Sequence, residues 1–176
     1  RVLAVLALSL AVLACTTAPE TGRRQLLLLS PAEEAQLGLK AFAQIKQQHP
    51  IVQRGQEAAL LQRVGTRIRR VAPLPNARWE FVLFEEDAPN AFALPGGKVG
   101  IYTGILPITK DEAGLATVVG HEIAHVVARH GAERMSHEML VKLGGAGLST
   151  ALGRDAGVTG DLIMQTYGVG SQLGVI

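Results

Sequence analysis

The residues best suited to chemistry in this chain form the run His121, Glu122, Ile123, Ala124 and His125. If the run is helical, the two histidines stand one turn apart on the same face, and their imidazoles can share one Zn²⁺ ion. Glu122 can then take a proton from the attacking water and pass it to a leaving amine. The run therefore predicts a zinc hydrolase. The alternative is a pair of ordinary core or surface histidines that bind no metal.

The residues that flank this run are mostly apolar. From Ala113 to Ala128, the ionisable side chains are His121, Glu122 and His125. A helix that is apolar on nearly all sides is typical of a buried helix, so we expect this one to be buried. Burying three titratable groups is costly unless something pairs with them, and a metal ion would provide that pairing.

Composition indicates one ordinary domain. The chain has 176 residues, of which 48% are apolar and 4% aromatic, so small aliphatic side chains must form most of the core. The formal net charge of +2 is too small to indicate nucleic acid as a partner. A row of arginines on one expected helix should face solvent or, alternatively, lipid headgroups: Arg63, Arg67 and Arg70.

The first residues resemble a bacterial export signal. Arg1 precedes an apolar stretch at residues 2–14 that is too short to span a bilayer as a mature helix. The stretch ends at Cys15 in a run that resembles a lipobox, so residues 1–14 are predicted to be a lipoprotein signal peptide and Cys15 the lipidated residue. Residues 15–29 would form a polar tether. The alternative is an ordinary signal peptide followed by an incidental cysteine.

Periodicity and turn residues predict a mainly helical α+β domain over residues 30–176. A capping box at residues 109–112 should begin the helix of the two histidines, with a small antiparallel sheet beside it. The other expected helices span residues 31–48, 56–71 and 135–143. The expected strands span residues 79–84, 91–94 and 99–102.

Two separated motifs resemble those of a known family. Residues 90–97 read Asn-Ala-Phe-Ala-Leu-Pro-Gly-Gly, and they precede residues 99–104 and then the His121 run with Arg129 and His130. In this order they are similar to peptidase family M48, the HtpX-like gluzincin metallopeptidases, and especially to its periplasmic lipoprotein branch. The resemblance implies a gluzincin-type domain with one Zn²⁺ ion per chain. His121 and His125 would be the metal ligands and Glu122 the general base.

The resemblance also implies a substrate-binding strand beside the metal. Four residues would edge the cleft and hold an extended peptide by main-chain hydrogen bonds: Asn90, Ala91, Phe92 and Ala93. From the sequence alone, an ordinary hairpin is the alternative for this segment.

The family's third zinc ligand is a glutamate on a later helix, and no glutamate follows Glu138 in this chain. We therefore expect the chain to stop before that helix, to bind zinc weakly and to lack activity as given. Asp155 or Asp161 is a less favoured substitute. His130 and His137 are expected to be structural or to support the ligands. Helical spacing places His130 about 140° around from His125.

Two functions fit these residues. The first is a zinc-dependent endopeptidase that cleaves unfolded or misassembled proteins of the bacterial envelope. In the lipoproteins that the chain resembles, aspartate after the lipidated cysteine signals retention in the inner membrane. This chain has Thr16 there, so we expect a lipid anchor on the periplasmic side of the outer membrane. The second function is a non-catalytic, chaperone-like or binding lipoprotein that uses the same cleft.

Overall fold

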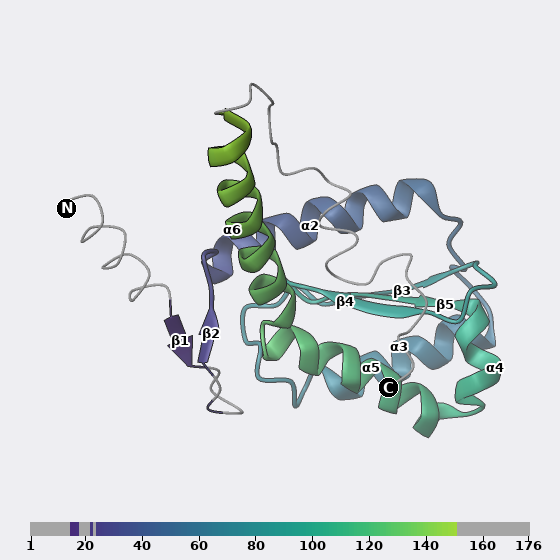
Figure 1. The fold of residues 1–176 in the computed structure, drawn as a ribbon. Coiled ribbons are helices and arrows are strands. Elements are labelled where there is room, and N and C mark those ends of the chain that lie inside the picture. Colours follow the sequence, from purple (N-terminus) through teal and green to yellow (C-terminus); the bar gives the residue numbers. More distant parts are fainter. Residues whose placement is uncertain (1–14, 18–21, 23, 151–176) are drawn as a thin grey trace.

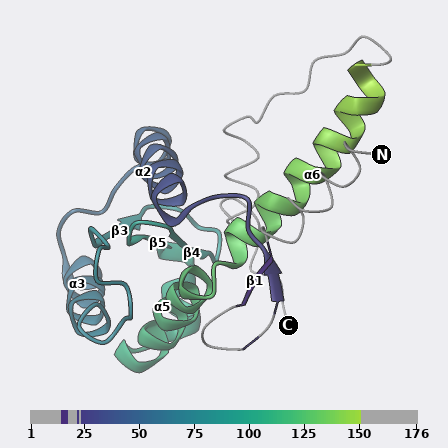
Figure 2. The same cartoon turned by 90° about the vertical axis from the view of Figure 1, so that its left-hand side faces the viewer.

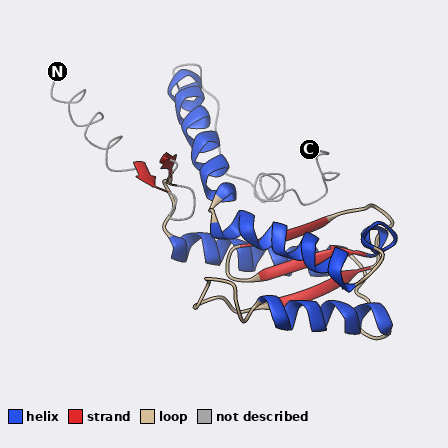
Figure 3. Cartoon of the chain, turned by 90° about the horizontal axis from the view of Figure 1, so that it is seen from below, coloured by secondary structure: helices blue, strands red, loops and turns tan. Residues whose placement is uncertain are grey.

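A sheet covered by helices on both faces is the framework of the molecule (Figure 1). Helix α2 (Pro31–Gln48) lies on one face, and helices α3 (Gln56–Ile68) and α5 (Glu112–Val127) lie on the other. Figure 3 shows the strands enclosed between these layers when the molecule is seen from below. The arrangement confirms the predicted α+β class.

The computed structural model describes residues 15–17, 22 and 24–150, with side chains at 17, 22 and 24–141. The predicted signal peptide, the Cys15 side chain, Asp155 and Asp161 all lie outside the part that is described. Within that part, no helix has the length and apolar character needed to cross a membrane.

The sheet contains β3 (Glu80–Phe84), β4 (Ala91–Leu94) and β5 (Lys98–Tyr102), in the order β3-β5-β4. β4 pairs antiparallel with β5, but β3 pairs parallel with it. The prediction of an antiparallel sheet is therefore wrong for one pairing. After β3, residues 85–90 lead to β4, which lies two positions away from β3 in the sheet. The tight turn at residues 95–97 then places β5 in the position between β3 and β4.

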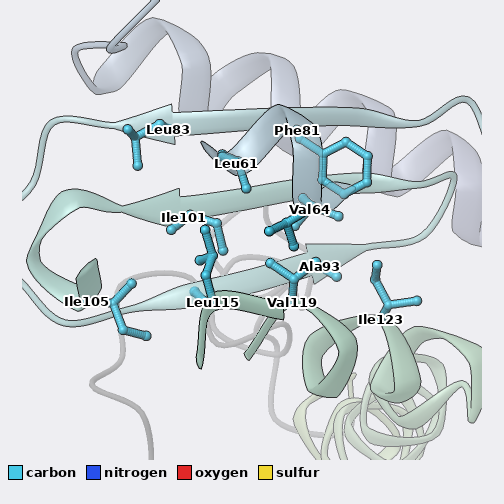
Figure 4. Close-up of a cluster of buried hydrophobic side chains, with 12 residues drawn as sticks. Leu61, Val64, Phe81, Leu83, Ala93, Ile101, Ile105, Leu115, Val119 and Ile123 are labelled. Carbon is cyan, nitrogen blue, oxygen red and sulfur yellow. The ribbon is translucent and has the colours of Figure 1, made fainter. Parts of the chain in front are cut away.

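Alternation along the strands divides the interior into two cores. Phe84, Phe92 and Tyr102 point toward α2, where they meet Phe42 and Ile45. The intervening residues point to the other face and pack against α3 and α5, as Figure 4 shows. These side chains from the second core include Phe81, Leu83, Ala91, Ala93, Val99 and Ile101.

Most helix boundaries follow the sequence signals. Ser30 begins α2 in the predicted capping box: its hydroxyl accepts from the Glu33 amide at 3.3 Å, and the Glu33 carboxylate accepts from the Ser30 amide at 2.8 Å. α3 ends at Ile68, earlier than predicted.

The start of α5 differs from the predicted capping box. Its N-cap is Asp111, whose carboxylate accepts from the Gly114 amide at 2.8 Å. Thr109 instead ends the short helix α4 (Leu106–Thr109), which follows a 3₁₀ turn at Thr103–Ile105, and its hydroxyl donates to the Leu106 carbonyl at 3.1 Å. The predicted cap is wrong because this hydroxyl is engaged within the preceding turn.

The N-terminal segment contacts the domain. β1 (Cys15–Thr17) and β2 (Arg24–Leu26) form an antiparallel ribbon, and Gln25 is only 3% exposed. Figure 2 shows this ribbon beside the base of α6 (His130–Thr150), which begins earlier than the predicted helix at 135–143 and extends away from the layered body. The end of the predicted tether therefore lies against the domain.

The close contact between Gly100 and Phe92 yields a stability prediction. A side chain at Gly100 would overlap the fully buried Phe92 ring. Gly100→Ala should therefore destabilise the protein by about 1–3 kcal/mol in a urea titration. Gly120→Ala is the matched control, because open space surrounds that position within α5 and the change should stabilise by about 0.5–1 kcal/mol. Equal urea midpoints for the two variants would contradict this packing.

Candidate active site

Helix α5 orients the motif through a stripe of apolar residues. Leu115, Val119 and Ile123 are at most 4% exposed and belong to the core beneath the sheet. His121 and His125 are offset from this stripe by two residues, about 200° around the helix, so they stand on the opposite face. The expectation of a fully buried helix is wrong, because the sheet and α3 contact one face of α5 and His121 is exposed.

The two motif histidines lie together on that outer face. The Nε2 atoms of His121 and His125 are 3.0 Å apart, and the rings stand nearly perpendicular at 86°. Two nitrogen ligands of a tetrahedral Zn²⁺ ion stand roughly 3.3 Å apart, because each Zn–N bond is about 2.0–2.1 Å long. The pair therefore fits two positions of a zinc site. Among the described residues, no group of three His, Cys, Asp or Glu side chains is arranged to hold a metal.

His130 supports His125 from the other side of its ring. The Nδ1 atoms of His125 and His130 are 2.7 Å apart, which leaves the His125 Nε2 atom directed at His121. The expectation from helical spacing is wrong here. α5 ends at Val127, and Arg129 adopts the left-handed conformation at φ 56°, which turns His130 back toward His125. This conformation costs a non-glycine residue about 1–2 kcal/mol.

The protonation of the site suits metal binding and proton transfer. Burial lowers the pKa of His125, and the charges of His121, His130 and Arg134 lower it further, which favours the neutral imidazole that binds metals. Burial raises the pKa of the Glu122 carboxyl to about 7. A carboxyl with a pKa near neutrality can both accept and return a proton.

An apolar hollow of about 510 Å³ lies beside the histidine pair. His121, His125 and His130 form its polar border, and Glu122 does not line it. The apolar wall comes from α5 and from the chain at the end of α3: Ile68, Val71, Ala72, Pro73, Ile123, Ala124, Val127 and Ala128. This wall was not predicted from the sequence, although Pro73 and Pro75 after α3 indicate a change of chain direction there.

The predicted substrate strand is β4, at the edge of the sheet and packed on α5. The Tyr102 amide donates to the Asn90 carbonyl at 3.0 Å, so alternation turns the amides and carbonyls of Ala91 and Ala93 away from β5. The Ala91 amide is satisfied by the Asn90 side chain at 2.9 Å. Ala91, Phe92 and Ala93 are at most 6% exposed, so this edge is closed in the structure.

A helix that carries this histidine pair beside the edge of a small sheet is the arrangement of a metallopeptidase domain. Residues 55–174 match the model of Peptidase family M48. The chain therefore belongs to peptidase family M48, whose members are zinc metallopeptidases.

Three relatives extend the comparison. The chain is 50% identical over 74 residues to the mitochondrial metalloendopeptidase OMA1 of Schizosaccharomyces pombe, covering 42% of this chain and 22% of the relative. It is 45% identical over 85 residues to that of Saccharomyces cerevisiae, covering 47% and 25%. It is 30% identical over 122 residues to the beta-barrel assembly-enhancing protease of Escherichia coli, covering 69% and 25%. The chain spans about a quarter of the length of these relatives.

Proposed function

We propose that this chain belongs to a zinc-dependent endopeptidase that cleaves unfolded or misassembled proteins of the bacterial envelope, and that it carries the general base and two of the zinc ligands. The observation that carries the proposal is the pair of Nε2 atoms 3.0 Å apart on the outer face of α5, with Glu122 adjacent. We assign one Zn²⁺ ion per chain to His121 and His125, with a further ligand outside the described residues. Nucleic acid has no role in this proposal.

The reaction follows from the roles of these side chains. When bound, zinc supplies Lewis-acid polarisation and lowers the pKa of water. Glu122, whose pKa is about 7, takes a proton from the attacking water and delivers it to the leaving amine. His130 holds the His125 ring so that Nε2 faces the metal position.

The substrate class follows from the edge strand. An extended backbone can add to β4 through the Ala93 amide and carbonyl, with Asn90, Ala91 and Phe92 in the same substrate-binding strand. An unfolded segment presents a free backbone of this kind along its length. Because the residues of this edge are at most 6% exposed in the structure, the groups that bury them must move before a substrate backbone can pair with β4. The apolar hollow beside His121 would then receive a substrate side chain.

Location and anchoring extend the proposal. Lipidation of Cys15 would hold the protein on the periplasmic side of the outer membrane, in the lipoprotein branch of the family. The polar residues at 16–24 and the lipobox-like run support this assignment. The name of the Escherichia coli relative, a beta-barrel assembly-enhancing protease, is consistent with an envelope role.

One observation favours a second function. The described residues supply two metal ligands rather than three, and the hollow and edge strand could bind a chain without cutting it. A non-catalytic, chaperone-like lipoprotein is therefore the alternative. It would bind unfolded protein without zinc-dependent turnover.

Substitution of the motif separates these functions. In the full-length protein, Glu122→Gln should keep zinc but lower the rate of casein hydrolysis by about 10²–10⁴-fold, because an amide cannot take the water's proton. His125→Ala should lose both zinc and hydrolysis. His137→Ala, an exposed histidine on α6, is the control and should lose neither. Zinc content and casein turnover are the measurements, and near-normal turnover in Glu122→Gln would rule out its role as base.

Ala93 provides a test of the edge strand. Ala93→Pro removes the outward amide donor without deleting a hydrogen bond between β4 and β5, so it should raise KM for casein at least tenfold and leave zinc content unchanged. Ala93→Gly keeps the amide and serves as the control. If both variants, shown by circular dichroism to be folded, have the same KM as the wild type, substrate does not pair at Ala93.

Fractionation of cells tests the anchor. Cys15→Ser should leave the protein unprocessed or release it from membranes, since the lipid-bearing thiol is gone. Thr16→Asp should keep the lipid and move the protein to the inner membrane. A Cys15→Ser protein that fractionates and migrates like the wild type would show that Cys15 carries no lipid.

A further inference from the structure

We propose that Arg129 is a positioning residue for the zinc site: bound to Glu34 and Leu29, it fixes the turn that brings His130 against His125. This inference rests on the proposed zinc peptidase function, because it concerns the orientation of a proposed zinc ligand. Arg129 would touch neither the metal nor the substrate.

The contacts of Arg129 join segments that are far apart in the sequence. Its Nε atom donates to the Glu34 carboxylate at 2.9 Å, and a terminal nitrogen donates to the same oxygen. That nitrogen also donates to the Leu29 carbonyl at 2.8 Å. Glu34 is 4% exposed, so removing Arg129 would leave a buried acidic group without this partner.

Two neighbouring contacts reinforce the same junction. Gln25 donates from Nε2 to the Ala128 carbonyl at 2.7 Å, and the Leu28 amide donates to the Ser136 hydroxyl at 2.9 Å. We call residues 25–34 the N-terminal clasp. Of the five buried polar or charged side chains in the described part of the chain, three lie at this junction: Gln25, Glu34 and Ser136.

The backbone at Arg129 explains why the clasp matters for the site. Its φ of 56° is a conformation that L side chains rarely adopt, and it lies between the end of α5 and the first residue of α6. A continued helix would carry His130 about 140° away from His125. The side-chain contacts stabilise the turn, and the turn places the two Nδ1 atoms 2.7 Å apart.

The clasp also ties this turn to the opposite side of the sheet. Glu34 lies in the first turn of α2, which the capping box of Ser30 and Glu33 fixes in place. α2 packs against the other face of the sheet from α5. The position of His130 is therefore set by the framework rather than by α5 alone, and partners of metal-binding histidines typically change metal affinity 10- to 100-fold.

A double-mutant cycle on the full-length protein tests this inference. Arg129→Ala and His130→Ala should each weaken zinc binding, measured by competition with a chelating dye, by about 10- to 100-fold. Because Arg129 acts through His130, the double variant should bind zinc no more weakly than His130→Ala alone. Arg129→Gly should retain more zinc affinity than Arg129→Ala, since glycine adopts positive φ freely. Fully additive losses, or wild-type affinity in folded Arg129→Ala, would overturn the proposal.

Ile105→Ala is the control for general destabilisation, because it empties a buried position at the end of the core that lies away from Ile123, as Figure 4 shows, and it touches neither α2 nor the histidines. At a temperature where both variants are folded, it should bind zinc like the wild type. In the metal-free protein, the ring nitrogen signals of His125 and His130 should shift in Arg129→Ala and not in Ile105→Ala. Unchanged signals in Arg129→Ala would refute the positioning role, whether or not the protein binds zinc. A wild-type protein that neither binds zinc nor cleaves casein would instead refute the proposed function.

Discussion

The burial of one stripe on α5 is the constraint on which the site depends. Leu115, Val119 and Ile123 recur every four residues and are held in the core under the sheet. His121 and His125 recur at the same interval, offset by two positions. Because both patterns share one helical period, fixing the first on the core fixes the second on the outside. Hydrophobic burial therefore places the histidine pair on the outer face of α5, and the contact with His130 then orients the His125 ring.

The sheet order adds the second half of the arrangement. β5 lies in the middle, where Gly100 leaves room for the Phe92 ring of its neighbour. This order leaves β4 at the edge and packs it directly on α5. The strand that could hold an extended backbone and the helix that carries the histidines are therefore in contact, and the apolar hollow lies along the same helix.

Local features of the fold could be predicted from the sequence, because their causes are local. The capping box at Ser30 and the turn glycines at residues 96 and 97 mark boundaries that the structure reproduces. The direction of β3 relative to β5 could not be predicted, because strand and turn patterns in a sequence do not determine which strands pair with each other. The contact between His125 and His130 was missed because helical extrapolation fails at Arg129, whose partners lie about a hundred positions earlier in the chain.

Of the histidines in this protein, we propose that His121 and His125 alone bind zinc. Zinc K-edge absorption spectroscopy of the full-length protein loaded with one equivalent of zinc tests it most directly, because outer-shell scattering counts imidazole ligands. We expect two imidazoles with Zn–N distances of about 2.0–2.1 Å. A spectrum with no imidazole, with one, or with three would contradict it, since three would bring His130 or another histidine into the metal site.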